Sequence, residues 1–185
     1  MTQALSLLQA ALVFGTVILF GALGEILTEK SGNLNLGVPG IMYLGGIAGL
    51  AGAFWYEGAA ASPNAMLGLI IALACSVVAA TLGGLIYSFL TITLRANQNV
   101  TGLTLTIFGS GVANLFGGDM NKLAGGVGQI SVATTSGAFR DTLPFLNGVG
   151  VLSGLGFMVY FAIILAIIAS YFLNRTRKGL NLRAV

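Results

Sequence analysis

The residues from Glu29 to Gly40 read EKSGNLNLGVPG and lie between two long apolar stretches. This segment holds two charges, a serine, two asparagines, three glycines and a proline. Glycine and proline interrupt helices, and a solvated loop has no need of the interleaved Leu34, Leu36 and Val38. Backbone that leaves helical geometry at membrane depth must be covered by protein or line a water-filled cavity. The segment therefore predicts a broken or re-entrant start to a membrane span. The alternative is an ordinary cytoplasmic turn.

The composition indicates a lipid environment. Of the 185 residues, 56% are hydrophobic and only 7% are charged, whereas soluble proteins are about 25% charged. The 28 glycines suit closely packed membrane helices, and Gly45, Gly49 and Ala53 follow one another at the four-residue spacing of a helix-packing stripe. The chain has no histidine, and its one cysteine, Cys75, lies in an apolar run. Zinc sites and disulfides are thereby excluded.

Five hydrophobic segments predict an all-α membrane protein, a polytopic bundle of about five transmembrane helices with one helix broken or re-entrant at its start. The predicted segments are 7–27, 36–55, 65–94, 100–117 and 149–173. As one helix the third would be ~45 Å long, against ~30 Å for the hydrocarbon core. It must tilt, protrude or break, with Gly83 and Gly84 as the candidate break. Ser62 and Pro63 form its expected helix start.

The charges predict an orientation for a single transmembrane domain covering residues 1–185. With five spans, six cations fall on one side of the membrane: Lys30, Arg95, Arg175, Arg177, Lys178 and Arg183. The positive-inside rule then places the C-terminus and the tail 174–185 in the cytoplasm, and the N-terminus and the loop 118–148 outside. In that loop, residues 128–136 alternate like a short strand, and residues 138–146 suit a brief helix.

A second group of uncharged polar residues lies in the fourth segment. Together with the first group they give the candidate solute path: Asn33, Asn35, Gln98, Asn99, Thr101, Thr104, Ser110 and Asn114. Thr106, Ser110 and Asn114 recur every four residues and form one helical stripe. An uncharged lining favours an uncharged polar solute over a dedicated ion filter. Alternatively, the hydroxyls bond their own backbone carbonyls or hold helices together.

Two charged features complete the candidates. Glu25 lies in the last turn of the first segment, and an acid in a membrane helix is a functional candidate by default. It could instead reach the interface or pair with Lys30 or Arg95. The cationic tail could anchor the chain and attract anionic lipid, or it could dock a cytoplasmic partner.

Three motifs carry a family resemblance. They are GEILTEKSGNLNLGVPGIMYLGG at 24–46, LRANQNVTGLTLTIFG at 94–109 and NRTRKGLNLRAV at 174–185. In this order and spacing they closely resemble the permease subunit of bacterial ABC importers of the branched-chain amino acid and ribose type. The nearest likeness is to the group described as nucleoside or simple-sugar permeases, and it runs over essentially the whole chain.

The resemblance implies a multi-pass protein of the bacterial plasma membrane that moves a nucleoside or related sugar-like solute by alternating access. It implies a sister permease, two cytoplasmic ATPases and an external substrate-binding lipoprotein as partners. Asn33 and Asn35 would lie near the translocation path, and Gln98, Asn99 and Thr101 at the inner end of the third and fourth spans. The third motif would mark the approach to the ATPase, which gives Arg175, Arg177, Lys178 and Arg183 as ATPase-facing residues.

No enzymatic activity is expected of this chain, because it lacks the phosphate-binding loop pattern of ATPases and any nucleophile–base pair. ATP would be bound by the partner subunit, and no cofactor, metal or nucleic acid by this chain. Two departures from the family stand out. Many relatives carry an acid at the position of Pro39, and relatives continue beyond Val185, so the chain is expected to be an N-terminal portion. The alternative functions are a fragment of a secondary transporter or channel, and a non-transporting membrane scaffold.

Overall fold

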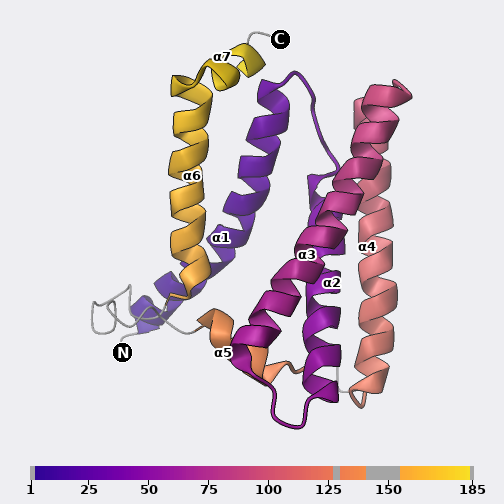
Figure 1. Ribbon diagram of the computed structural model, residues 1–185, viewed down its shortest axis with the longest axis vertical. Coiled ribbons are helices and arrows are strands. Elements are labelled where there is room, and N and C mark those ends of the chain that lie inside the picture. The colour runs from indigo at the N-terminus through magenta and orange to yellow at the C-terminus, as the bar shows by residue number, and fades with distance from the viewer. Residues whose placement is uncertain (1–2, 127–129, 141–154, 184–185) are drawn as a thin grey trace. The chain divides into compact units, whose positions relative to one another are not determined.

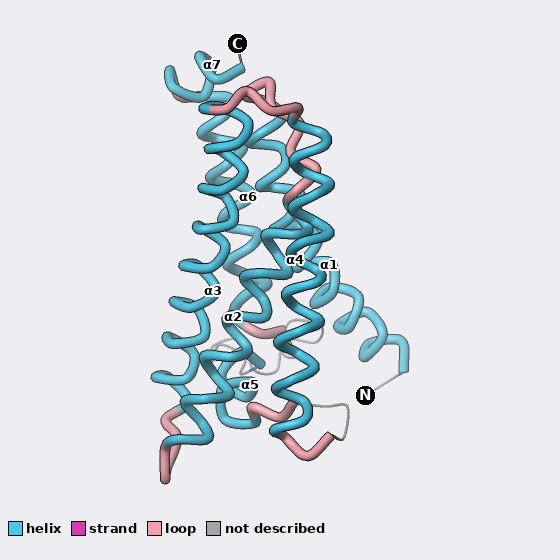
Figure 2. The backbone as a smooth tube through the Cα atoms, turned by 90° about the vertical axis from the view of Figure 1, so that its right-hand side faces the viewer, coloured by secondary structure: helices cyan, strands magenta, loops and turns pink. Residues whose placement is uncertain are grey.

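The computed structural model describes residues 3–126, 130–140 and 155–183. Within these ranges the chain forms helices and loops and no strand (Figure 2). Five of the helices are long and apolar enough to cross a membrane, which confirms the predicted fold class. These five are α1 (Gln3–Lys30), α2 (Val38–Ala59), α3 (Ala65–Ser88, extended by a π-helical turn at Phe89–Thr93), α4 (Gln98–Leu123) and α6 (Phe157–Arg175).

The helices form two compact units. Residues Met1–Leu34 and Phe139–Val185 make one, called here the α1–α6 unit, and Asn35–Ala138 make the other, the α2–α4 unit. In the α1–α6 unit, helices α1 and α6 pack together, and the ring centroids of Phe20 and Phe161 lie 6.1 Å apart. The short helix α7 (Arg177–Arg183) follows α6 and turns across its end (Figure 1).

In the α2–α4 unit, helix α2 packs against both α3 and α4 (Figure 1). The small-residue stripe on α2 is buried. A Cβ added to Gly49 would lie 3.0 Å from the Ala72 carbonyl oxygen, and one added to Gly45 would lie 3.2 Å from the Ser76 Oγ atom. Small side chains here allow α3 to approach the backbone of α2, as is common between membrane helices. The packing interpretation of the stripe is therefore confirmed.

Helix α3 begins at Ala65, where the third apolar segment was predicted to begin, but its cap differs from the expected one. Its N-cap is Asn64, whose Oδ1 atom accepts hydrogen bonds from the N–H groups of Met66 at 2.9 Å and Leu67 at 3.3 Å. The expected start at Ser62 and Pro63 is wrong, because the asparagine immediately before the helix satisfies two of the four amide groups that every helix start leaves open.

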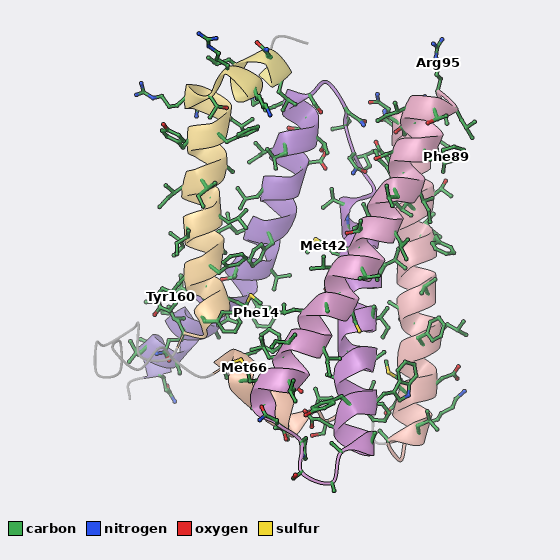
Figure 3. All side chains as sticks on the ribbon, viewed as in Figure 1. Phe14, Met42, Met66, Phe89, Arg95 and Tyr160 are labelled. Atoms are coloured by element: carbon green, nitrogen blue, oxygen red, sulfur yellow. The ribbon has the colours of Figure 1, made fainter. Side chains whose placement is uncertain are left out.

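The expected break at Gly83 and Gly84 is also wrong, because α3 continues through both residues to Ser88. Gly83 is buried against α2, and a Cβ there would lie 3.2 Å from the Leu44 Cδ1 atom, so this glycine serves close packing. The helix changes geometry further on, at the π-helical turn, after which Arg95 adopts a φ of 53°. Arg95 extends away from this end of the helix (Figure 3).

The segment that follows α4 contains a short helix, α5 (Ala133–Arg140). The strand expected at 128–136 is wrong for the part described, because Ala133–Ser136 are helical. Glu57 of α2 explains this: its carboxylate accepts hydrogen bonds from the N–H groups of Thr135 at 2.6 Å and Thr134 at 3.4 Å. The brief helix expected at 138–146 is found only for 138–140, since 141–146 lie outside the described residues.

Candidate solute path

The connection between α1 and α2 begins where α1 ends in a glycine-terminated turn. Gly32 has a φ of 77°, its N–H donates to the Glu29 carbonyl at 3.0 Å, and the Asn33 N–H donates to the Thr28 carbonyl at 3.0 Å. This pair of bonds is the Schellman motif, in which a left-handed residue stops a helix. The chain then runs without helix to Gly37.

The backbone of the last residues before α2 lies against α4. The Asn35 side chain is only 6% exposed, and its Oδ1 atom accepts a hydrogen bond of 2.9 Å from the Gly37 N–H. A Cβ added to Gly102 of α4 would lie 2.8 Å from the Gly37 nitrogen and 2.9 Å from the Leu36 nitrogen. The non-helical backbone thus lies directly on α4, where a larger residue at position 102 would not fit.

A hydroxyl of α4 satisfies one carbonyl of this backbone. The Thr106 Oγ1 atom donates a hydrogen bond of 2.8 Å to the Leu36 carbonyl oxygen. One turn along α2, Gly40 meets Gly109 so closely that a Cβ on Gly109 would overlap the Gly40 carbonyl and lie 2.7 Å from its Cα atom. The start of α2 and the first half of α4 therefore form one interlocked element in which the exposed backbone group is paired.

The other hydroxyls of α4 have local roles. Thr104 donates to the Val100 carbonyl at 2.8 Å, and Ser110 donates to the Ile107 carbonyl at 2.9 Å. These bonds match the alternative in which hydroxyls bond the carbonyls of their own helix. Thr101 is buried, with 8% exposure, whereas Asn114 is exposed. Along the predicted stripe, Thr106 bonds to the segment before α2, Ser110 bonds within its own helix, and Asn114 is exposed at the surface.

Gln98 and Asn99 open α4. Gln98 is half-buried and Asn99 is exposed. Asn97, which the sequence analysis did not single out, is the N-cap: its Oδ1 atom accepts from the N–H groups of Asn99 at 3.0 Å and Val100 at 3.2 Å. An asparagine directly before a predicted helix is the signal that would have found it.

A cavity of about 350 Å³ lies between the end of α3 and the start of α4. Its lining residues are Ile86, Tyr87, Leu90, Val100, Thr101, Thr104, Leu105 and Phe108. Leu105 also lies against the non-helical segment, since a Cβ on Gly37 would be 3.1 Å from its Cδ2 atom. Of the predicted path residues, Thr101 and Thr104 line this cavity, and Asn35 lies in the same unit.

The remaining candidates belong to the α1–α6 unit. Glu25 and Asn33 are half-buried there, at the end of α1 and just after it. The basic residues predicted to face an ATPase lie at the end of α6 and in α7, where Arg175, Arg177 and Lys178 are exposed. Across the described ranges no group of three or more His, Cys, Asp or Glu residues could hold a metal ion.

Comparison with known proteins places this architecture in a family. The sequence model of the family described as "Branched-chain amino acid transport system / permease component" matches residues 7–185. The chain belongs to this permease family. With its five long apolar helices, this membership makes it a multi-pass membrane protein and confirms the resemblance drawn from the three motifs.

Individual relatives support the same assignment. The putative glucose ABC transporter permease protein TsgC13 of Haloferax volcanii is 31% identical over 186 residues, covering 100% of this chain and 53% of the relative. The guanosine ABC transporter permease protein NupQ of Bacillus subtilis is 32% identical, covering 99% of this chain and 56% of the relative. The nucleoside ABC transporter permease protein NupC of Lactococcus lactis is 27% identical, covering 94% of this chain and 53% of the relative.

The chain spans about half the length of the curated relatives it matches. No solved structure matches it.

Proposed function

We propose that this chain is a membrane-spanning permease component of an ATP-driven importer whose solute is a nucleoside or a related sugar-like molecule. The observation that carries the proposal is the uncharged, non-helical segment Asn35–Gly37 lying on α4, in which Asn35 and Gly37 are buried. In a membrane such backbone occurs where protein or a water-filled cavity covers it. The relatives described above are named as permeases for glucose, guanosine and nucleosides, all of which are uncharged polar molecules.

The proposed path uses the side chains at that end of the α2–α4 unit. Asn35 and Thr101 are buried there, and Gln98, Asn99 and Thr104 lie on the neighbouring turns of α4, while Ser110 and Asn114 continue along the same helix. Asn33 and Glu25, which belong to the α1–α6 unit, are proposed as further path residues. Alternating access would move the start of α2 and α4 together, because the Thr106–Leu36 hydrogen bond and the close glycine contacts join them.

The proposed partners follow from the family. ATP would be bound and hydrolysed by a separate cytoplasmic subunit, which the exposed cations Arg175, Arg177 and Lys178 would face, together with Arg183. A sister permease and an external substrate-binding lipoprotein would complete the importer, and anionic lipid would contact the same cations. The proposed orientation has the N-terminus outside and the C-terminus in the cytoplasm, as the distribution of cations favours.

Uptake measurements test this proposal. The chain is produced in bacterial cells together with an ATPase and a substrate-binding lipoprotein of this importer type, and entry of radiolabelled guanosine and glucose is followed. We expect uptake that stops when the ATP-binding loop of the ATPase is mutated and that continues when a proton ionophore collapses the membrane potential. Uptake that needs the proton gradient instead would favour a secondary transporter.

Replacement of Glu25 separates the two energy sources further. Proton-coupled carriers rely on buried acids, so Glu25→Gln should abolish uptake in a carrier and leave most of it in an ATP-driven importer. Co-purification of the chain with an ATPase, without uptake of any solute by the complete assembly, would instead indicate a scaffold. Either result would overturn the proposal.

A further inference from the structure

Helices α1 and α6 end on the same side of their unit, and a groove runs between them toward these ends. Lys30 is the last residue of α1 and Arg175 the last residue of α6 (Figure 1). Two adjoining depressions between the helices have volumes of about 670 Å³ and 390 Å³. Because Ala166, Ser170 and Asn174 line both of them, the two form one continuous feature, called here the α1–α6 groove. All of its lining residues belong to the α1–α6 unit.

The chemistry of the α1–α6 groove changes along its length. Aliphatic side chains line the part that is farthest from the helix ends, and they are Leu19, Leu23, Ile163, Ala166 and Ile167. The next turn of α6 contributes the hydroxyls of Ser170 and Tyr171. At the helix ends the lining contains the Asn174 amide and two cations, Arg175 and Lys30. The groove therefore passes from hydrocarbon, through hydroxyl groups, to positive charge.

The length of the groove matches one leaflet of a bilayer. At ~1.5 Å per residue, the stretch from Leu19 to Lys30 rises about 16 Å along α1, and the stretch from Ile163 to Arg175 rises about 18 Å along α6. Half of the ~30 Å hydrocarbon core is ~15 Å. With its cations at one membrane surface, the groove would thus reach the middle of the bilayer. Tyrosine, lysine and arginine near its charged end are the residues that membrane helices place at the interface.

The cations at the end of the groove are a distinct part of the basic tail region. Lys30 and Arg175 are exposed and line the groove, whereas the two acids of α1, Glu25 and Glu29, are not among its lining residues. Arg177 and Lys178 of α7 are also exposed but line neither depression. The lining therefore presents two positive charges directly beside hydroxyl groups and hydrocarbon.

From this gradient and this length we infer that the α1–α6 groove is a binding site for one anionic phospholipid. Its acyl chain would lie along the aliphatic part, its glycerol esters beside Ser170 and Tyr171, and its phosphodiester between Lys30 and Arg175. Basic pockets between membrane helices bind the headgroups of anionic lipids. A soluble phosphate would leave the aliphatic part without a partner, and a zwitterionic lipid would bring a third cation close to the other two.

The inference goes beyond the proposed function, because it needs only a chain that spans a membrane. It also divides the proposed roles of the cations. Lys30 and Arg175 would hold the lipid, and Arg177 and Lys178 would remain for the proposed ATPase. In the proposed orientation the lipid belongs to the cytoplasmic leaflet.

Photo-cross-linking tests the inference on the complete chain in phosphatidylcholine nanodiscs. The probe is phosphatidylglycerol with a diazirine halfway along one acyl chain, and the matched probe carries the same chain on a phosphocholine headgroup. Mass spectrometry maps the labelled residues. We expect the anionic probe to label positions 19–23 and 163–167 roughly 5- to 30-fold more than the matched probe, as one to two cations near the surface would favour. Both probes should label Val77 and Val78, exposed residues of α3, equally.

Matched variants assign this preference to the groove. Lys30→Gln combined with Arg175→Gln should abolish it, and Lys30→Arg combined with Arg175→Lys should keep it. Arg177→Gln combined with Lys178→Gln removes the same charge from α7 and should leave the preference unchanged. Unaltered labelling of α3 by both probes shows that each variant is still inserted in the bilayer.

A change of groove width tests the apolar part without altering charge. Ala166 lines both depressions, so Ala166→Leu should narrow the groove and reduce labelling of its aliphatic residues by the anionic probe severalfold. Ala11→Leu, at an exposed position of α1 outside the groove, should have no effect. Glycerol phosphate, which has the phosphate but no acyl chain, should not displace the probe.

Four results would overturn the inference. They are equal labelling of the groove by the two probes, a preference that survives the loss of Lys30 and Arg175, an equal loss when the α7 cations are replaced, and displacement by glycerol phosphate. The third would indicate diffuse attraction to the basic tail, and the fourth a site for soluble phosphate. The uptake experiment is read separately: uptake without a lipid preference would refute the lipid site alone, and a lipid preference without uptake would refute the importer alone.

Discussion

The Thr106 hydroxyl donates a 2.8 Å hydrogen bond to the Leu36 carbonyl, which lies 70 positions earlier in the chain. Leu36 precedes α2, and an unpaired backbone carbonyl would be costly in lipid. The Thr106 side chain thus allows the backbone at Leu36 to stay non-helical. The bond also makes the start of α2 and the first half of α4 a single mechanical element.

Thr106→Val should destabilise the α2–α4 unit, because valine keeps the volume of threonine and removes the donor. We expect a loss of about 1 kcal/mol, equivalent to ~2–4 °C in the unfolding temperature of a chain of this size. Thr106→Ser keeps the hydroxyl donor and should retain most of the stability that Thr106→Val loses. Unfolding can be followed with a thiol-reactive dye that reports exposure of Cys75, which is half-buried in α3.

The control for this substitution is Thr81→Val. The Thr81 hydroxyl donates to the Val77 carbonyl of its own helix at 2.7 Å, and that carbonyl already belongs to the helical hydrogen-bond pattern of α3. Loss of the Thr81 hydroxyl should therefore shift the unfolding temperature little. Equal shifts for Thr106→Val and Thr81→Val would contradict a special role for the bond to Leu36.

Gly109→Ala should have a larger effect than the threonine change. The added Cβ would overlap the Gly40 carbonyl and lie 2.7 Å from its Cα atom, and a backbone cannot move aside as the end of a side chain can. Overpacking of this kind costs ~1–3 kcal/mol or more. The same dye-based unfolding assay would detect it as early exposure of Cys75.

Gly111→Ala is the matched control on the same helix. No atom lies within 4 Å of a Cβ at position 111, so the change should be neutral or should stabilise α4 by up to about 1 kcal/mol through helix propensity. A stable Gly109→Ala variant with unaltered unfolding would show that α2 and α4 are not in contact at this point.

The helical architecture was readable from the sequence because long apolar runs leave few alternatives in a membrane. The helix ends were harder. Ser62 and Asn64 are both good caps, and only the folded chain shows which one bonds the first amides of α3. The start of helix α5 was mistaken for a strand, because the carboxylate that stabilises it belongs to Glu57, far away in the chain.

The candidate path was predictable only in part, for a related reason. The mixture of polar and apolar residues before α2 indicated burial of Asn35, and the structure places it at 6% exposure. Tyr87 and Phe108 gave no signal, because an aromatic residue in a membrane helix usually faces lipid or another helix. The cavity they line depends on the pairing of α3 with α4, which no local pattern specifies.

Gly32→Ala should weaken the end of α1. Gly32 has a φ of 77°, a left-handed conformation that costs a residue with a Cβ roughly 1–2 kcal/mol, and no neighbouring atom would obstruct the new methyl group. Gly32→Asn should be tolerated better, because asparagine adopts this conformation more readily. The unfolding temperature of each purified variant is the measurement.

Gly24→Ala in the interior of α1 serves as the control. No atom lies within 4 Å of its added Cβ, and its backbone is helical, so this change should be neutral or stabilising. If both glycine variants behaved alike, the strained turn after α1 would not be present in the membrane.

Glu57→Ala should release the start of α5. The carboxylate accepts the Thr135 N–H at 2.6 Å and the Thr134 N–H at 3.4 Å, and a negative charge at a helix N-terminus is favourable. A charge-assisted hydrogen bond is worth ~1.5–3 kcal/mol, so amide exchange of these two N–H groups should accelerate by roughly 10- to 100-fold. Hydrogen–deuterium exchange with mass spectrometry measures this directly.

Glu57→Gln separates charge from hydrogen bonding at the same position. Glutamine keeps an oxygen acceptor of nearly the same reach and loses the negative charge, so exchange at α5 should fall between the original chain and Glu57→Ala. Glu29→Ala, at an exposed position of α1, should leave α5 unchanged. Because Thr135 is 2% exposed and seated against Gly68 of α3, side-chain packing could hold α5 without the carboxylate. Unaltered exchange in Glu57→Ala would show that this packing, and not Glu57, fixes α5 on the ends of α2 and α3.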